Sequence, residues 1–542
     1  HRRTATAFGG SDYAATAEQH EEDWHPRRML WRVRRQTMTA GPETGLPLHI
    51  KNVATLDWNK CDEFVTTHLA DMSLVWSALT APFRDASVTK QFFEQHRGLT
   101  VAQIDRADIE TLVKHKKLEE IPPQNAKASA RSFAVQEAVE KKRRRWILHP
   151  SDFNESSAEL PKVEFPTRKI HKQYGACIDF AAYFQQFKMN SDAAEYFTIM
   201  KDGRTYKPTT VPTGARQPPL FGQLLATAIC AAVKARVDEI EVDAWIDNVR
   251  VVGTYGKVQE ALDAIFDICA KLGVTINEER KTVSPSTFYT YLGIAFDHAE
   301  KTIDVADKTK AKVTVDYNRL CSAGESWTRA DLLSNFGRCI WAGSILGLSR
   351  AKRYFTLKFA RRRLSTGSTS EKVAVWPSVV EEWKSWMKEI TTARPRRIVQ
   401  QESGENQPDF KIYTDASLTG YGGVIFDEGG YQDTVIAGRW KRLSHINHLE
   451  LLAVKLTLEK WEPPKRKLGL ETKVEIHIDN TSCLGQLRRG YARRYTTNRV
   501  VQEIEKILTA KNIRVLSWQY IESASNPADA PSRAGVGATA SA

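Results

Sequence analysis

The sequence predicts a multidomain α+β protein in which a helical N-terminal extension precedes a mixed region, a second helical region and a C-terminal α/β domain. The chain has 542 residues, too many for a single core at the usual domain size of about 100–200 residues. Helical periodicity and short strand-like runs occupy different stretches. The polar stretch "QQESGENQPDF" at 400–410 is typical of a linker.

These patterns give six predicted segments. They are the basic, mainly helical extension 1–125, the mixed region 126–300, the helical region 301–398, the linker 399–408, the α/β domain 409–534 and a flexible tail 535–542.

Composition favours a soluble intracellular protein. Hydrophobic residues make up 42% and charged residues 26%, with no run that predicts a bilayer span, so we expect no membrane partner. The seven cysteines are scattered without a C-x-x-C pair, which argues against a zinc site or a disulfide framework. We expect a reducing compartment, either cytoplasm or nucleus, and an organelle stays open as an alternative. The absence of an initiator methionine is consistent with a processed protein or a piece of a polyprotein.

The basic residues predict a polyanionic partner. Lysine plus arginine exceed aspartate plus glutamate by 78 − 65 = 13. The excess basic residues lie in three clusters, at 141–145, 350–363 and 487–494. A single cluster of this kind is more often an ordinary solvated surface. Arginine-weighted clusters interleaved with aromatic residues instead favour nucleic acid. The candidate nucleic-acid-binding residues are Arg350, Lys352, Arg353, Arg361, Arg362, Arg363, Arg488 and Arg489.

Two acids follow apolar runs in the mixed region. Asp179 ends "ACID" and Asp247 ends "AWID", and Asn248 follows the second acid. Either acid alone is more often a turn or capping residue. Together, carboxylates at strand ends are what a two-metal phosphoryl-transfer site requires, with two cations about 3.5–4 Å apart.

The surroundings of these acids resemble the fingers and palm of reverse transcriptases. Asp179 with Phe184 matches the first palm motif of that family, and "WIDN" stands where the family usually has an aromatic residue, any residue and two aspartates. The resemblance implies a right-hand polymerase fold in which Asp179, Asp247 and Asn248 form the catalytic site and Phe184 faces the nucleotide sugar.

The same resemblance implies further nucleotide-binding residues. "VPTGARQPPLFGQ" at 211–223 supplies Gly214 and Arg216, and "GVTINEERKT" at 273–282 supplies Lys281. Arg145 stands in the place of the arginine that grips the triphosphate, although His149 and Ser151 depart from the family pattern. Glycine permits a close backbone approach.

The helical region resembles a polymerase thumb. "SWTRADLLSNFGRCIWAGSILGL" at 326–348 and "VWPSVVEEWKSWMKEI" at 375–390 have helical periodicity on either side of the basic segment. This arrangement is most similar to retroelements of the tyrosine-recombinase, or DIRS-like, group.

The C-terminal domain resembles ribonuclease H in the order and spacing of four acids. Asp415 follows a strand-like run, Glu450 lies in a predicted helix, Asp479 ends a buried strand and Asp529 lies near the C-terminus. The resemblance implies that these four carboxylates hold two Mg²⁺ ions, which prefer oxygen ligands, with Mn²⁺ as a substitute.

The sequence therefore predicts a reverse transcriptase and ribonuclease H of retroelement type. Its expected partners are an RNA template, RNA/DNA hybrid and deoxynucleoside triphosphates. Two alternatives stay open: a domesticated RNA-binding structural subunit of a ribonucleoprotein, contacting other subunits through its N-terminal extension, and a nuclease with an inactive polymerase. Three features favour the structural subunit: Asn248 in the place of an acid, the altered positions His149 and Ser151, and the long helical N-terminal extension.

Overall fold

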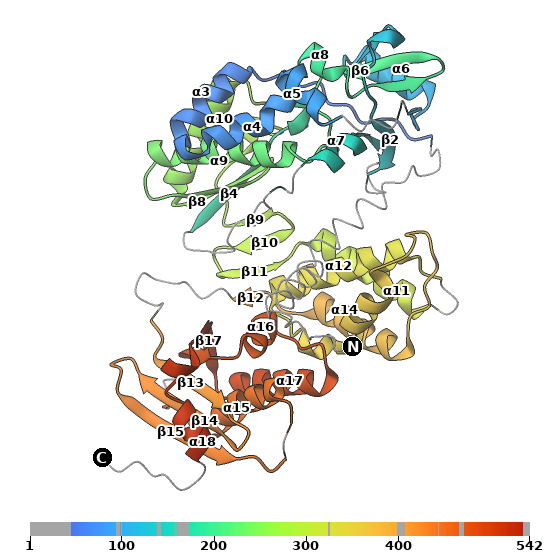
Figure 1. The fold of residues 1–542 in the computed structure, drawn as a ribbon. Helices are drawn as coiled ribbons and strands as arrows, with labels where there is room; N and C mark the ends of the chain where they lie inside the picture. Colours follow the sequence, from blue (N-terminus) through green and yellow to red (C-terminus); the bar gives the residue numbers. More distant parts are fainter. Residues whose placement is uncertain are drawn as a thin grey trace, which may run out of the picture. The chain divides into compact units, whose positions relative to one another are not determined.

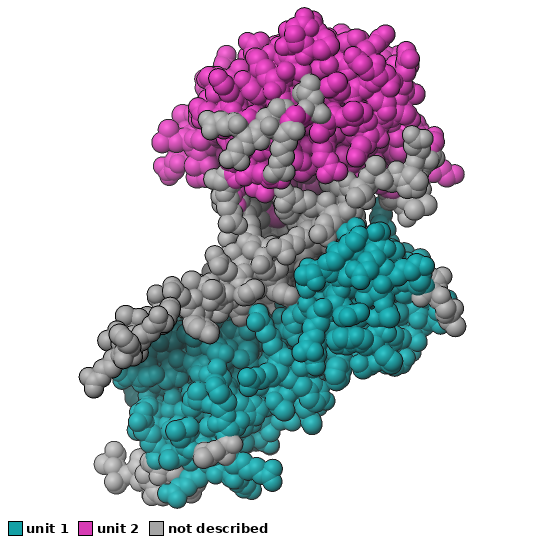
Figure 2. All heavy atoms as spheres, turned by 45° about the vertical axis from the view of Figure 1, so that its right-hand side comes forward, with its two compact units in different colours: residues 1–33, 307–394, 401–542 teal, residues 34–306, 395–400 magenta. Residues whose placement is uncertain are grey.

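The computed structural model describes residues 45–93, 98, 100–137, 142–157, 160, 173–322, 326–397, 407–442, 444–464 and 471–534. Residues 1–44 of the predicted extension, most of the predicted linker and the predicted tail lie outside these ranges. The chain divides into two compact units (Figure 2). Unit 1 comprises residues 1–33, 307–394 and 401–542, and unit 2 comprises residues 34–306 and 395–400.

Unit 2 is built on a three-stranded antiparallel sheet in the order β4-β8-β7. Strand alternation separates its two faces. Apolar residues such as Ile178, Val249 and Val251 point to the buried face, which is covered by two long helices (Figure 1). The elements are β4 (Tyr174–Asp179), β7 (Glu241–Trp245), β8 (Asn248–Gly253), α9 (Pro218–Arg236) and α10 (Tyr255–Leu272).

Part of the predicted N-terminal extension belongs to this core. Trp76 and Phe83 are almost fully buried, and both rings contact Phe221 of α9, with centroids 6.0 and 5.9 Å apart. The described part of the predicted extension and the mixed region after residue 125 therefore belong to the same compact unit. The helices of this region are α3 (Trp58–His68), α4 (Ser73–Arg84), α5 (Ala86–Gln91) and α6 (Arg106–Lys114).

The rest of unit 2 consists of small sheets and short helices. Strands β1, β6 and β5 form one sheet, β2 and β3 form a hairpin, and β12, β11, β10 and β9 form a third sheet. Their bounds are β1 (Leu118–Ile121), β2 (Arg131–Gln136), β3 (Arg144–His149), α7 (Ser151–Ser156), α8 (Ser191–Ala194), β5 (Ile199–Lys201), β6 (Arg204–Pro208), β9 (Phe288–Tyr291), β10 (Ile294–Asp297), β11 (Thr302–Val305) and β12 (Arg396–Arg397).

Helix α9 is, among the described residues, the one helix long and apolar enough by composition to cross a membrane. Its buried residues include Phe221, Leu225, Ile229 and Val233, all of which lie in the core of unit 2. A buried core helix accounts for this composition without a membrane.

Unit 1 begins with a helical bundle. Helices α11 and α14 pack together, and α12 packs against both. The paired tryptophans of the sequence, Trp383 and Trp386, are buried in this bundle and both meet the ring of Phe336 edge-on. The helices are α11 (Asp307–Cys321), α12 (Arg329–Leu346), α13 (Tyr354–Phe359) and α14 (Pro377–Thr392).

The second part of unit 1 is a five-stranded mixed sheet in the order β15-β14-β13-β16-β17. Strands β13, β14 and β15 are antiparallel neighbours, whereas β13, β16 and β17 run parallel. Helix α15 packs on β13 and β14 and against α17. The elements are β13 (Phe410–Ala416), β14 (Gly420–Asp427), β15 (Gln432–Arg439), α15 (Ile446–Lys460), β16 (Thr472–Ile478), α16 (Thr481–Arg489), α17 (Tyr495–Ala510), β17 (Ile513–Tyr520) and α18 (Asp529–Ala534).

The bundle and the sheet domain of unit 1 share a core. Ala351 lies in the apolar cluster of the sheet domain, and its carbonyl accepts hydrogen bonds from the side-chain amides of Asn498 and Gln502, both at 2.7 Å. The ring of Tyr354 meets that of Tyr495, with centroids 5.2 Å apart. The basic aromatic segment therefore fastens the bundle to the sheet domain.

Candidate active sites

A tight hairpin presents Asp247 in unit 2. Strand β7 ends at Trp245 and β8 begins at Asn248, so Ile246 and Asp247 form the turn. Ile246 has a φ of 58°, the left-handed conformation that such short hairpins require. Across the sheet, Asp179 at the end of β4 pairs with Asn248, and the backbone N–H of Phe180 donates to the carbonyl of Asp247 at 2.7 Å. The fold thus brings the two predicted metal-binding acids together.

Both acids have a pKa above the usual value for aspartate. Burial and the nearby charge of Asp247 raise the pKa of Asp179 to about 6. Burial also raises the pKa of Asp247, opposed by the side-chain amide of Asn248, which donates to the Asp247 carboxylate at 3.0 Å. Two half-buried carboxylates with raised pKa values are stabilised in their charged form by a cation, and their oxygens suit Mg²⁺.

A loop that the sequence did not single out completes this site. Asn277 donates its side-chain amide to the Asp179 carboxylate, and the backbone N–H of Asp179 donates to the carboxylate of Glu278 at 3.0 Å. The charge of Glu278 adds to the rise in the pKa of Asp179. Both residues lie within the stretch "GVTINEERKT", in which the predicted nucleotide-binding residue is Lys281.

The predicted nucleotide-binding residues lie in different environments. Lys281 is 82% exposed and pairs with Glu279 at 2.8 Å. Arg145 is 61% exposed and pairs with Glu137 at 2.6 Å, and its positive charge lowers the pKa of Asp247. Among the described residues, the ion-pair partners of Arg145 and Lys281 are therefore Glu137 and Glu279, and the charge of Arg145 also acts on Asp247.

The other three predicted nucleotide-binding residues, Gly214, Arg216 and Phe184, contact neighbouring segments of unit 2. Gly214 permits a close approach, but to its own chain, because a Cβ atom there would lie 2.7 Å from the carbonyl oxygen of Leu148. The backbone N–H of Arg216 donates to the side chain of Asn154 at 3.0 Å. Phe184 is half-buried in the 3₁₀ helix Tyr183–Gln186, against Gly222 of α9.

Three of the four predicted nuclease acids cluster in unit 1. Asp415 lies at the end of β13 and Asp479 directly follows β16, a parallel neighbour, so both emerge at the same sheet edge. Glu450 reaches them from α15. Oxygen atoms of the three carboxylates lie within 4.8 Å of one another. Among the described residues this is the one such group of acidic, histidine or cysteine side chains.

The electrostatics of this cluster fit a divalent cation. Asp415 and Glu450 are each only 4% exposed. Burial and the charges of Asp479 and Asp415 raise the pKa of Glu450 to about 9, and burial together with the charges of Asp479 and Asp529 raises that of Asp415 to about 6. In the described part of the chain the buried Oε2 of Glu450 has no hydrogen-bond partner. An oxygen donor set of this kind suits Mg²⁺.

The fourth predicted ligand, Asp529, lies just outside the cluster. It begins α18, and Arg533 one turn later donates to its carboxylate at 2.7 Å. Its charge nevertheless reaches Asp415 and raises the pKa of that residue. The sequence analysis missed Ser523, whose hydroxyl donates to Asp479 at 2.6 Å.

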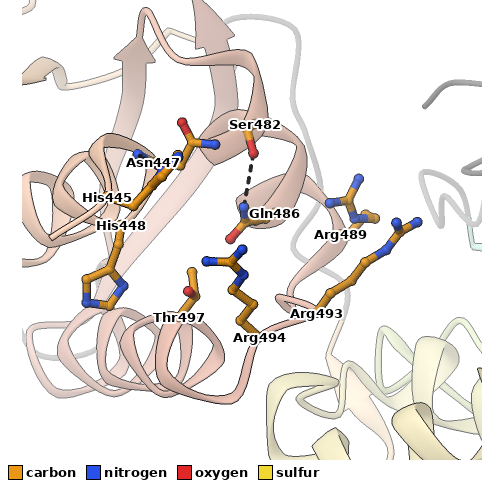
Figure 3. A pocket seen from close by; sticks show the side chains of 9 residues that line it. All are labelled: His445, Asn447, His448, Ser482, Gln486, Arg489, Arg493, Arg494 and Thr497. Atoms are coloured by element: carbon orange, nitrogen blue, oxygen red, sulfur yellow. Dashed lines mark hydrogen bonds between the residues drawn. The ribbon is translucent and has the colours of Figure 1, made fainter. Parts of the chain in front are cut away.

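A polar pocket of about 270 Å³ lies beside the cluster, at the start of α15 and between α16 and α17. Figure 3 shows arginines on one side of it and the start of α15 on the other. Its lining comprises His445, Asn447, His448, Ser482, Gln486, Arg489, Arg493, Arg494 and Thr497. Of the residues predicted to bind nucleic acid, Arg489 lines the pocket, whereas Arg488 donates to the carbonyl of Trp518 at 2.7 Å.

The basic segment of the bundle divides into buried and exposed residues. Arg353 is only 4% exposed, pairs with Glu389 and lies 5.8 Å from the ring of Trp386, so its side chain is engaged inside the bundle, and its contact with nucleic acid stays a prediction. Arg361 is half-buried over the ring of Tyr491, at 5.9 Å. Arg350 is also half-buried, whereas Lys352, Arg362 and Arg363 are exposed.

We find no family model and no curated protein that matches the chain. Its structure is similar to that of a foamy viral protease-reverse transcriptase in complex with RNA/DNA hybrid, at 12% identity and a TM-score of 0.45, covering 88% of this chain and 64% of that one. A structure of that protein with dsDNA gives 14% identity and a TM-score of 0.44, covering 88% and 99%. A structure of the form denoted dRH with ds DNA gives 12% identity and a TM-score of 0.43, covering 88% of this chain and 84% of that one. These likenesses are too distant to assign an activity.

Proposed function

We propose that the chain is an RNA-directed DNA polymerase with ribonuclease H activity on RNA/DNA hybrids. The observation that supports this most is the group formed by Asp415, Glu450 and Asp479 at the edge of the sheet in unit 1. A second pair, Asp179 and Asp247, lies at strand ends in unit 2. One chain with two carboxylate sites suits a polymerase whose product is also the substrate of its nuclease.

The nuclease site is proposed to bind Mg²⁺ through the three clustered acids. Mg²⁺ held there would orient a water molecule in line with the phosphodiester and neutralise charge on the leaving oxygen. Burial of Asp415 and Glu450 fixes their side chains beside the cleavage point. Asp479, the half-buried acid of the three, is held in place by a hydrogen bond from the hydroxyl of Ser523.

The adjacent pocket is proposed to hold the strand that is not cut. Arg489, Arg493 and Arg494 lie on one side of it and Asn447 on the other (Figure 3). Arginine pairs with phosphate oxygens in a bidentate geometry, and amides donate to them. Contacts to one backbone fix the register of the duplex, so that the other strand meets the acids.

The polymerase site is proposed to use Asp179 and Asp247 as its Mg²⁺ ligands. Asn248 donates to Asp247 and brings no negative charge. The site therefore has one fewer carboxylate than the pattern it resembles, and binding of Mg²⁺ is expected to be weaker. A slow polymerase that demands high metal concentration is the expected result.

Asn248 also favours the second candidate function, a domesticated subunit that binds RNA without copying it. In that case the hydrogen bond from Asn248 serves to satisfy Asp247 without metal. The clustered nuclease acids argue against this alternative, because two buried acids beside a half-buried third destabilise a fold that has no use for them.

One coupled assay separates these possibilities. The purified chain is incubated with a 5′-labelled primer on a differently labelled RNA template, nucleotides and Mg²⁺, and both strands are followed. We expect the primer to lengthen and the RNA to shorten. Asp247→Asn should abolish only the first change and Asp479→Asn only the second. Binding of the primed template with neither change, in Mg²⁺ or Mn²⁺, would support the structural subunit.

A further inference from the structure

A strand-like segment of the N-terminal region connects two parts of the polymerase site in unit 2. At one end, the N–H of His49 donates to the carbonyl of Arg144 at 2.7 Å, and the N–H of Arg144 donates to the carbonyl of Pro47 at 2.9 Å. At the other end, the N–H of Leu56 donates to the carbonyl of Gln186 at 2.6 Å. The segment thus runs from β3, which contains Arg145, to the 3₁₀ helix that follows Asp179.

Lys51 lies between these two anchor points and reaches the site. Its ammonium group donates to the side-chain carbonyl of Asn277, and the amide of Asn277 donates in turn to the Asp179 carboxylate. Lys51 is half-buried. Among the described residues its partner is this neutral amide, and no carboxylate forms an ion pair with it.

Lys51 and Arg145 differ in the groups that hold them. Arg145 already has a carboxylate partner in Glu137, whereas Lys51 is held only by the neutral amide of Asn277. An ammonium held by a neutral group, on a flexible four-carbon stem, is well suited to accept an anionic ligand.

We propose that Lys51 binds the polyphosphate of the incoming nucleoside triphosphate, an inference that rests on the proposed polymerase function. Asp179 and Asp247 would hold the metals of a polymerase site, and the reacting phosphate would lie beside these acids, so the remaining phosphates would extend within reach of neighbouring side chains. Lys51 replaces its bond to Asn277 by a charge-assisted bond to a phosphate oxygen. The N-terminal segment thereby becomes part of the nucleotide site.

The test compares Lys51→Ala with Lys51→Arg and with Lys60→Ala, a control on the exposed face of α3. Primer extension by the full chain is measured against nucleotide concentration and, separately, against primer–template concentration. Loss of one charge-assisted bond predicts a rise of about tenfold or more in the KM for nucleotide in Lys51→Ala. The KM for primer–template should stay within about twofold. Lys51→Arg should recover most of the affinity, and Lys60→Ala should behave as wild type.

A second readout does not depend on catalysis. With a chain-terminated primer, the next correct nucleotide should slow dissociation of the wild-type complex, and about tenfold more nucleotide should be needed for Lys51→Ala. If wild type extends primers and Lys51→Ala matches Lys60→Ala, the role of Lys51 is refuted while the polymerase stands. A change only in the KM for primer–template would also refute it, in favour of a backbone contact. If wild type neither extends primers nor responds to nucleotide, both proposals fail.

Discussion

Asn248 donates its side-chain amide to the carboxylate of Asp247 at 3.0 Å, while its own backbone position lies directly opposite Asp179 in the neighbouring strand. The amide thus occupies a place from which a second carboxylate would face the same cations. A neutral amide keeps an oxygen donor but gives up one negative charge, and Mg²⁺ prefers carboxylate.

Asn248→Asp is therefore expected to improve primer extension. The concentration of Mg²⁺ that gives half-maximal extension should fall by about tenfold or more, in the range that supporting residues of metal sites usually control. Asp247→Asn should abolish extension. A metal titration of wild type and both variants measures this, and an Asn248→Asp variant that stays inactive in Mg²⁺ and Mn²⁺ would favour the structural subunit.

The nuclease cluster should make stability depend on pH and metal. Folding raises the pKa of Asp415 to about 6 and that of Glu450 to about 9. The cost of ionising them is absent below the unfolded pKa of about 4 and grows as the pH rises toward the folded values. Without metal, unit 1 is therefore expected to lose stability between about pH 4 and pH 9, and Mg²⁺ should restore it.

Glu450→Gln tests this directly. At pH 8 without metal it should raise the melting temperature of unit 1, by about 2–4 °C for each kcal/mol gained, and the gain should vanish near pH 4. Glu428→Gln, at an exposed position of the same domain, is the control. Equal melting temperatures for Glu450→Gln and wild type across this pH range would contradict the electrostatic account.

The exposed arginines of the bundle are expected to contact a duplex backbone. Arg362 and Arg363 face solvent, whereas Arg361 lies half-buried over Tyr491. Each phosphate contact contributes about 0.9 to the slope of log affinity against log salt. Replacing Arg362 and Arg363 by Ala should therefore lower that slope by about two, as measured by hybrid binding at several salt concentrations. An unchanged slope would assign both residues to an ordinary solvated surface.

Asn498 is expected to hold the two parts of unit 1 together. It is fully buried, donates to the carbonyl of Ala351 at 2.7 Å and accepts from the N–H of Ala492 at 3.0 Å. Asn498→Ala leaves buried polar groups without partners and should cost about 1–3 kcal/mol of unfolding free energy. Urea denaturation measures the loss. Gln502→Ala, which removes only one partly buried bond to the same carbonyl, should cost less, and the reverse order would contradict this account.

The positions of the candidate acids in the fold could be predicted from sequence, because each one lies at or just after the end of a strand or in a helix that local patterns reveal. Alternating apolar residues mark β13 and β16, and their parallel pairing places Asp415 beside Asp479. Asp529 and Arg533 are four residues apart, about one helical turn, so their ion pair could also be predicted from sequence.

Contacts between distant segments could not be predicted in this way. Arg353 belongs to a basic cluster in sequence, yet its ion pair with Glu389 depends on how two helices pack. Similarly, Lys51 and Asn277 are brought together only by the fold. Local patterns do not predict such pairings. Hydrophobic periodicity shows which face of a helix or strand is buried, but not which other element packs against that face.

Cleavage of an RNA/DNA hybrid shows whether Asp415, Glu450 and Asp479 form a nuclease site. A hybrid with 5′-labelled RNA is incubated with the full chain in increasing Mg²⁺, beside Asp479→Asn. The account predicts Mg²⁺-dependent cutting of the RNA strand by wild type and none by Asp479→Asn, although both bind the hybrid with similar affinity, because binding depends mainly on the backbone. A wild-type chain that binds the hybrid but leaves the RNA intact in Mg²⁺ and in Mn²⁺ would contradict it.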